Sequence, residues 1–258
     1  MYEFDFEKPS TVAEAVAALA DDEAQALGGG QTLIPTLKQR LASPSKLVSL
    51  TGIAEMKGVS IADGVLTIGG AATHAEVAAD ACAPLAALAA NIGDPAVRNR
   101  GTIGGSLANN DPAACYPSAM LALNATIVTN SREIAADDYF QGMFETALEE
   151  GEIITGVRIN VPDGANYQKF EQPASRFALV GVFVAKTADG VRVGVTGASE
   201  EGAFRWTDAE AALNGSFSAD AVPAAPSADG MISDLHGSGA YRAHLVAVLT
   251  KRAVAAIG

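Results

Sequence analysis

Apolar and polar residues follow two recurring patterns along the 258-residue chain. Short apolar or alternating runs are typical of strands, and they occur at 4–6, 46–50, 59–61, 65–68, in the second half of 120–128, and at 153–161, 177–186 and 191–196. Helical spacing predicts helices at 12–19, 36–41, 84–91, 138–148 and 239–257. The capping-box pattern Thr73-His74-Ala75-Glu76 predicts the start of a further, Ala-rich helix. In the last helix the pattern predicts Tyr241, Leu245, Val248 and Leu249 inward and Arg242, Lys251 and Arg252 outward.

Turn signals divide these elements into three predicted domains of a mixed α/β (α+β) fold. Residues 1–55 read as strand, helix, strand, helix, strand, which is typical of a small α/β unit. Residues 56–162 open with a hairpin around Asp63-Gly64. The Pro162-Asp163-Gly164 turn marks the start of the third domain, 163–258.

Two glycine-rich stretches interrupt this apolar pattern. The first is Gly28-Gly29-Gly30-Gln31-Thr32, and the second runs from Arg98 to Pro112 and contains Thr102-Ile103-Gly104-Gly105-Ser106. Glycine lets consecutive backbone N–H groups turn toward an anion, and Thr, Ser and Asn add side-chain hydrogen bonds. We expect the two stretches to hold the diphosphate of a nucleotide-like cofactor. The alternative is that they are ordinary glycine-rich loops between strands.

Composition and missing motifs exclude several other functions. No GxGxxG or GxxxxGK[ST] motif is present, which argues against a Rossmann unit and a P-loop. Two cysteines are too few for an iron–sulfur cluster, and three scattered His with no HExxH or CxxC predict no metal site. A net charge of −13 argues against nucleic acid as a partner. No apolar run could span a bilayer, and the acidic N-terminus predicts a cytoplasmic protein.

Four segments carry a resemblance to a known family. They are LGGGQTLIPTLKQRLASPSKLVSL at 27–50, IGDPAVRNRGTIGGSLANNDPAA at 92–114, FETALEEGEIITGVRI at 144–159 and SGAYRAHLVAVLTKRAV at 238–254. Together they resemble the FAD-binding medium subunits of molybdenum hydroxylases, with most similarity to aerobic carbon monoxide dehydrogenase medium chains. The resemblance implies a two-lobed FAD-binding fold of the vanillyl-alcohol-oxidase type, followed by a C-terminal α/β domain.

The resemblance also implies which residues bind FAD. In the first loop they are Gly28, Gly29, Gly30, Gln31 and Thr32, followed by Leu33 and Ile34 along the adenosine or ribityl part. In the second they are Thr102, Ile103, Gly104, Gly105 and Ser106. Ile154 is expected near the adenine, Lys169 on the flavin side, and Phe177 stacked against the isoalloxazine.

This sequence departs from the family pattern at two places. Cys115 stands where the family usually has an Asp that hydrogen-bonds the cofactor, so Asn110 or Asp111 is expected to replace that contact. Arg176-Phe177 occupies the place of an Asp-Tyr or Asp-Phe pair beside the flavin ring.

The resemblance implies an electron-transfer function without a catalytic acid, base or nucleophile in this chain. FAD would take electrons from iron–sulfur clusters of a small subunit and pass them to a quinone or other acceptor. A molybdenum-binding large subunit would oxidise the substrate, and the whole would be a dimer of heterotrimers. Carbon monoxide, a heterocycle or an aldehyde all remain open as that substrate. Two alternatives stay open: a stand-alone FAD oxidase of the same fold, and a non-catalytic nucleotide-binding module.

Overall fold

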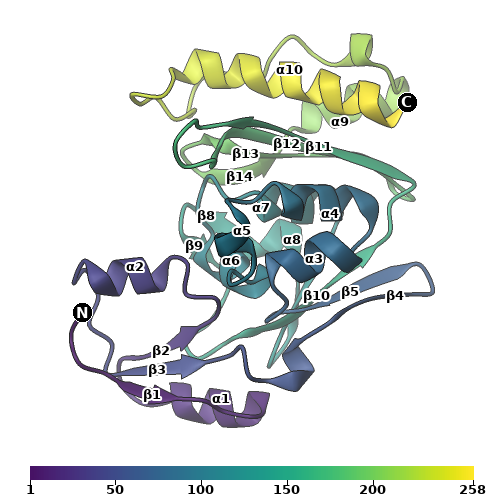
Figure 1. The fold of residues 1–258 in the computed structure, drawn as a ribbon. Helices are drawn as coiled ribbons and strands as arrows, with labels where there is room; N and C mark the ends of the chain where they lie inside the picture. Colours follow the sequence, from purple (N-terminus) through teal and green to yellow (C-terminus); the bar gives the residue numbers. More distant parts are fainter.

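The computed structural model describes residues 1–258 and arranges their strands in four sheets (Figure 1). The strands are β1 (Asp5–Glu7), β2 (Ala24–Leu27), β3 (Lys46–Ser49), β4 (Val59–Ala62), β5 (Val65–Gly69), β6 (Thr126–Thr129), β7 (Glu133–Ala135), β8 (Phe140–Gly142), β9 (Glu145–Thr146), β10 (Ile154–Asn160), β11 (Gly164–Glu171), β12 (Ala178–Thr187), β13 (Gly190–Ser199) and β14 (Gly202–Arg205). The helices are α1 (Val12–Leu19), α2 (Leu33–Lys38), α3 (His74–Asp80), α4 (Ala83–Ala90), α5 (Pro95–Arg98), α6 (Ile103–Asn109), α7 (Tyr116–Ala122), α8 (Ala136–Tyr139), α9 (Thr207–Gly215) and α10 (Gly239–Ile257), with short 3-10 turns at Ala54–Met56 and Ala219–Ala221. None of the helices is long and apolar enough to cross a membrane.

The first sheet is small and parallel, with the strand order β1-β3-β2. Thr11 caps the helix that follows β1, because its hydroxyl accepts a hydrogen bond from the backbone N–H of Glu14 at 3.2 Å. Ala15 and Ala18 of α1 are buried with Val48 of β3 in one apolar cluster. Helix α2 lies on the other side of the sheet from α1 in Figure 1.

The second sheet is antiparallel, with the order β4-β5-β10-β6-β7. The hairpin β4–β5 turns at Asp63 (φ 50°) and Gly64 (φ 77°), the positive values that a tight hairpin turn requires. Thr73 and Glu76 form the expected capping box at the start of α3. Helices α3, α4, α6 and α7 lie between this sheet and the next (Figure 1).

The third sheet, β11-β12-β13-β14, is antiparallel and is covered on both faces. Helix α10 packs on one face, and α4 and α7 pack on the other (Figure 1). Residues Ala178–Ala185 of β12 are therefore all buried. The largest apolar cluster joins Phe183 of this sheet to Tyr116 of α7, so the core continues past the chain reversal at Pro162.

Two expectations from the apolar pattern are wrong. The helix predicted over 138–148 ends at Tyr139 and is followed by the hairpin β8–β9. This hairpin forms because Asn110, remote in sequence, donates to the carbonyls of Gly142 and Glu145, both at 2.8 Å, and accepts from the backbone N–H of Phe144. The helix predicted at 36–41 begins three residues earlier, at Leu33.

The orientation predicted for α10 also needs correction at its first turn. Tyr241 is 40% exposed, whereas Arg242 is 2% exposed. The Arg242 guanidinium donates to the carbonyls of Leu179 and Gly197, both at 2.7 Å, and to Asp234 at 2.8 Å. The burial of Arg242 is tolerated because its guanidinium has these carbonyl and carboxylate partners.

Candidate cofactor-binding site

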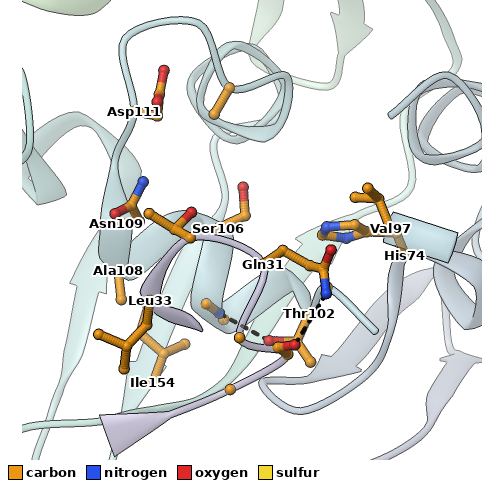
Figure 2. Close-up of a pocket in the computed structure, with 18 of the residues that line it drawn as sticks. Gln31, Leu33, His74, Val97, Thr102, Ser106, Ala108, Asn109, Asp111 and Ile154 are labelled. Carbon is orange, nitrogen blue, oxygen red and sulfur yellow. Dashed lines mark hydrogen bonds between the residues drawn. The ribbon is translucent and has the colours of Figure 1, made fainter. Parts of the chain in front are cut away.

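A cavity of about 680 Å³ lies where the three larger sheets and their helices meet. It is lined by the loop after β2, by the segments around α3, α5 and α6, and by Lys169 and Phe177 near the ends of β11 and β12. Cofactor sites are commonly concave and of this size. Figure 2 shows Leu33 and Ile154 together on one side, His74 and Val97 on the other, and Gln31 and Thr102 between them.

The first glycine loop, Gly28–Thr32, joins β2 to α2 along the cavity wall. The six backbone N–H groups from Gly28 to Leu33 donate no hydrogen bond to any atom of the chain. Gly30 has a φ of +74°, which only glycine adopts readily. Consecutive unpaired N–H groups beside a cavity form an anion-binding site of the kind that a diphosphate requires.

The second glycine segment, Thr102–Ser106, is the first turn of helix α6 rather than an open loop. Four of its five N–H groups already have partners: Ile103 donates to the Ala72 carbonyl at 3.0 Å, Gly104 to the Gly70 carbonyl at 2.9 Å, and Gly105 to the Thr102 hydroxyl at 3.1 Å. Ser106 donates to the Thr102 carbonyl at 3.0 Å. Our expectation that these amides are free for an anion is therefore wrong. What this segment offers the cavity is the hydroxyls of Thr102 and Ser106 and the bare surface of Gly105.

Glycine lets the two segments touch backbone to backbone. A Cβ at Gly29 would lie 1.9 Å from the Arg100 carbonyl oxygen, and one at Gly28 would lie 3.0 Å from the Thr102 hydroxyl. A Cβ at Gly104 would lie 2.5 Å from the Gly70 oxygen. Any larger residue at Gly29 or Gly104 would push main chains apart, so these glycines set the spacing of the cavity walls.

The structure brings the predicted binding residues to one cavity, with three exceptions. Ile34, Ile103 and Asn110 do not line it. Ile34 lies beneath Gly30, Ile103 is fully buried in the core, and the Asn110 side-chain amide is committed to the β8–β9 hairpin. Asp111 does line the cavity, although its carboxylate also accepts from the backbone N–H of Ala113 at 2.8 Å. Cys115 is buried and lines the cavity as a free thiol.

Several lining residues were missed by the sequence prediction. Gly70 lines the cavity, although the Gly69-Gly70 pair reads from sequence as a simple strand-to-helix turn. His74 also lines it, is 5% exposed, and lies 3.3 Å from the Tyr116 hydroxyl through Nδ1. Burial, with a smaller effect from Arg98, lowers the pKa of His74 to about 4, so this imidazole is neutral at pH 7. From sequence, His74 reads only as part of the capping turn of a helix, and nothing in that pattern predicts a cavity beside it.

Charged groups lie on separate parts of the wall. Lys169 donates to the Asn91 carbonyl at 2.8 Å, and Arg176 lies 3.5 Å from the Gly93 carbonyl. Glu152 is held by Arg132 at 3.0 Å, which lowers the pKa of its carboxyl group to about 2. Because Arg132 already compensates Glu152, Lys169 and Arg176 are the cations that remain for a bound anionic cofactor.

FAD fits this arrangement on two grounds. The unpaired amides and the hydroxyls of Thr102 and Ser106 meet the needs of a diphosphate. Apolar residues on either side of this polar centre, Leu33 and Ile154 against Val97, suit the two ring systems of a dinucleotide (Figure 2).

Comparison with known proteins supports this interpretation. Residues 2–162 match the family model described as the FAD binding domain in molybdopterin dehydrogenase. The nicotine 6-hydroxylase medium subunit of Paenarthrobacter nicotinovorans is 36% identical, over 98% of this chain and 96% of that protein. The carbon monoxide dehydrogenase medium chain of Afipia carboxidovorans is 33% identical, over 97% and 95%.

A comparison with a solved structure supports the same family at the level of the fold. A chain of carbon monoxide dehydrogenase from Hydrogenophaga pseudoflava superposes with a TM-score of 0.89 at 30% identity, covering 99% of this chain and 97% of that one. The expected family, the FAD-binding fold and the cofactor are thereby confirmed. The chain belongs to the FAD-binding medium subunits of molybdenum hydroxylases, and it is an oxidoreductase subunit.

Proposed function

We propose that this chain is the electron-transfer subunit of a heteromeric molybdenum hydroxylase. Its FAD takes electrons from iron–sulfur clusters of a small partner subunit and passes them to a quinone or other acceptor. The observation that carries the proposal is the row of six unpaired amides, Gly28 to Leu33, in residues that line a cavity built from three sheets. The chain itself has two cysteines, too few to ligate a cluster, so the clusters belong to a partner.

The residues that bind FAD in this proposal divide into three groups. The amides of Gly28, Gly29, Gly30, Gln31, Thr32 and Leu33 bind the diphosphate, and Thr102, Gly104, Gly105 and Ser106 close the opposite wall. Ile154 contacts the adenosine part, and Lys169 and Phe177 contact the flavin part, with Asp111 beside the second segment. Ile34, Ile103 and the Asn110 side chain are left out because they lie outside the cavity.

In this proposal the cofactor supplies the redox chemistry, and the chain binds the cofactor and sets the charge around it. FAD supplies reversible electron exchange once it is bound. Neutral His74 adds no charge to the wall, whereas Lys169 and Arg176 add positive charge. A nearby cation favours the more negative form of a redox group, so these two residues raise the affinity of the site for electrons.

The partners in this proposal are an iron–sulfur small subunit and a molybdenum-binding large subunit, assembled as a dimer of heterotrimers. The large subunit determines the substrate, and relatives with this chain's architecture carry names that refer to nicotine, carbon monoxide and glyceraldehyde. Both cysteines are free thiols, which suits the reducing cytoplasm where we place the complex. The three domains in the proposal are residues 1–55, 56–162 and 163–258.

Purification of a tagged chain together with its native partners tests the proposal. We expect a flavin spectrum, and iron and molybdenum that co-purify in fixed ratios to FAD. Rapid mixing with the substrate of the large subunit should bleach the flavin bands after the iron–sulfur bands. Flavin that purifies without iron, or that is reduced by substrate in the isolated chain, would overturn the proposal in favour of a stand-alone oxidase.

A further inference from the structure

The two ring nitrogens of His74 have different surroundings. The side chain is buried, and its Nδ1 lies 3.3 Å from the Tyr116 hydroxyl. Nε2 has no hydrogen-bond partner in the chain, and yet it is not sealed in the protein interior. Because His74 lines the cofactor cavity, this nitrogen opens into the cavity.

The Tyr116 hydroxyl determines which nitrogen of His74 carries the proton. Tyr116 is fully buried, and burial raises the pKa of its phenol well above the usual value, so the hydroxyl stays protonated. Its single partner in the chain is His74 Nδ1. If Nδ1 were the donor, the hydroxyl proton would have no acceptor, whereas a hydroxyl that donates to Nδ1 leaves no buried donor unsatisfied. The neutral imidazole therefore carries its proton on Nε2, and the cavity wall presents an N–H donor.

Gly101 leaves this donor uncovered. A Cβ at Gly101 would lie 2.5 Å from His74 Nε2 and 2.8 Å from its Cδ2. Any larger residue would therefore push the imidazole away from its place in the wall. The backbone N–H of His74 donates to the Gly101 carbonyl at 2.9 Å, which fixes the two residues to each other.

Contacts through Gly93 connect His74 to the part of the wall that contains Phe177. The Gly93 carbonyl lies 3.5 Å from the guanidinium of Arg176, the neighbour of Phe177 in the chain. The same carbonyl accepts from Arg98 at 3.0 Å, and Arg98 is the charged group that acts on His74.

The position of His74 leaves two possible acceptors on the cofactor. Figure 2 shows His74 with Val97, across the cavity from Leu33 and Ile154, which favours the flavin half. The first glycine loop also touches Gly101, since a Cβ at Gly29 would lie 2.6 Å from the Gly101 Cα, so the diphosphate is the competing source of an acceptor.

We propose that His74 donates a hydrogen bond from Nε2–H to the flavin half of FAD. A flavin ring carries carbonyl and ring-nitrogen acceptors, and a buried acceptor without a donor costs free energy. The diphosphate already has the six unpaired amides of the first loop. His74 thus orients the flavin without adding a charge beside it. This inference rests on the proposed function, because the flavin end near Lys169 and Phe177 is part of that proposal.

The test compares FAD with ADP, which has the adenosine part and the diphosphate but no flavin. Both are titrated by calorimetry into the FAD-depleted full-length chain as wild type, His74→Asn and His74→Gln. The Asn amide reaches only the Nδ1 position, whereas the longer Gln side chain keeps a donor near the Nε2 position. The matched control is His236→Asn, the same exchange at an exposed position outside the cavity, and the unfolding temperature of each protein is measured.

We expect the dissociation constant for FAD to rise roughly 2- to 12-fold in His74→Asn, the range for one neutral hydrogen bond, and to change less in His74→Gln. The affinity for ADP should be the same in all four proteins. Equal losses for FAD and ADP in His74→Asn would move the donor to the diphosphate and overturn the flavin contact. Unchanged FAD binding in a folded His74→Asn would overturn the hydrogen bond altogether.

Nitrogen NMR of the ¹⁵N-histidine-labelled wild type needs no variant to fold. At pH 7 we expect His74 to show a protonated Nε2 and an unprotonated Nδ1, and FAD to shift the Nε2 signal more than ADP does. The opposite tautomer, or equal shifts with FAD and ADP, would overturn the proposal. None of these results depends on a partner subunit, so FAD that purifies without iron would overturn the proposed function and leave the His74 contact standing.

Discussion

Gly29→Ala offers the sharpest test of how the cavity walls are spaced. The added Cβ would lie 1.9 Å from the Arg100 oxygen, 2.5 Å from the Arg100 carbonyl carbon and 2.6 Å from the Gly101 Cα. Real Cβ contacts essentially never fall below 3.0 Å, so the first glycine loop and the Arg100–Gly101 main chain must separate by about 1 Å. This movement displaces the six unpaired amides relative to Thr102 and Ser106 across the cavity.

The cost of the substitution can be estimated from overpacking elsewhere in proteins. Forcing extra atoms into a closed contact costs about 1–3 kcal/mol. If this free-energy cost destabilises the FAD-bound state and not the free protein, the dissociation constant for FAD rises roughly 5- to 150-fold. Gly105→Ala should have a smaller effect, because its Cβ meets only the Thr102 hydroxyl at 3.0 Å.

A fluorescence titration of the FAD-depleted chain with FAD measures these affinities. Gly215→Ala is the matched control, because a Cβ there has no neighbour within 4 Å. We expect affinity to fall in the order wild type and Gly215→Ala, then Gly105→Ala, then Gly29→Ala. Far-UV circular dichroism should be unchanged, because the three apolar clusters do not include Gly29.

Wild-type affinity in Gly29→Ala would refute the reasoning, since the loop would then move without cost. If Gly29→Ala fails to fold, Gly105→Val takes its place. Its side chain enters the cavity at an exposed position with no main-chain contact, so it should weaken FAD binding in a folded protein.

Three further predictions concern stability. Glu152→Gln removes a carboxylate whose folded pKa, about 2, is below its unfolded value, so it stabilises the fold above pH 4.5; we expect a loss of about 1–3 kcal/mol at pH 7 in urea unfolding, and a smaller decline than in the wild type between pH 4.5 and 2. An unchanged acid profile would contradict this. Arg242→Met leaves strand carbonyls without their donor and should cost about 2–4 kcal/mol, with Arg242→Lys intermediate in thermal unfolding; equal stability of all three would count against the buried guanidinium. His74 has a folded pKa of about 4, below its unfolded 6.5, so protonation favours the unfolded state and wild-type stability should fall as the pH drops from 6.5 toward 4. In His74→Gln this part of the decline should be missing, and parallel pH profiles for the two proteins would show that His74 is not its source.

Local signals in the sequence predict much of this fold. Helix α10 has the predicted bounds, Gly239–Ile257, and Thr73 and Glu76 form the predicted capping box, because both patterns depend on residues close in the chain. The hairpin at 140–146 was missed because its geometry depends on Asn110, more than thirty residues away. The buried position of Arg242 likewise depends on carbonyls of distant strands.

The same limit applies to the site. The free amides of Gly28–Leu33 follow a local glycine pattern, so the first loop is readable from sequence. The amides of the second segment are used by carbonyls of Gly70 and Ala72, which no local pattern reveals. His74 and Gly70 reach the cavity through the same tertiary contacts.

The burial of β12 on both faces limits how this chain can be recombined with its relatives. The family model stops at residue 162, but the apolar cluster around Phe183 and Tyr116 continues beyond it. In a chimaera joined at residue 162, α4 and α7 of one parent would have to pack against the β11-β12-β13-β14 sheet of the other. Exchange of the C-terminal region should therefore yield a well-packed hybrid only when the matching residues of α4 and α7 are exchanged with it, so these segments are expected to evolve together.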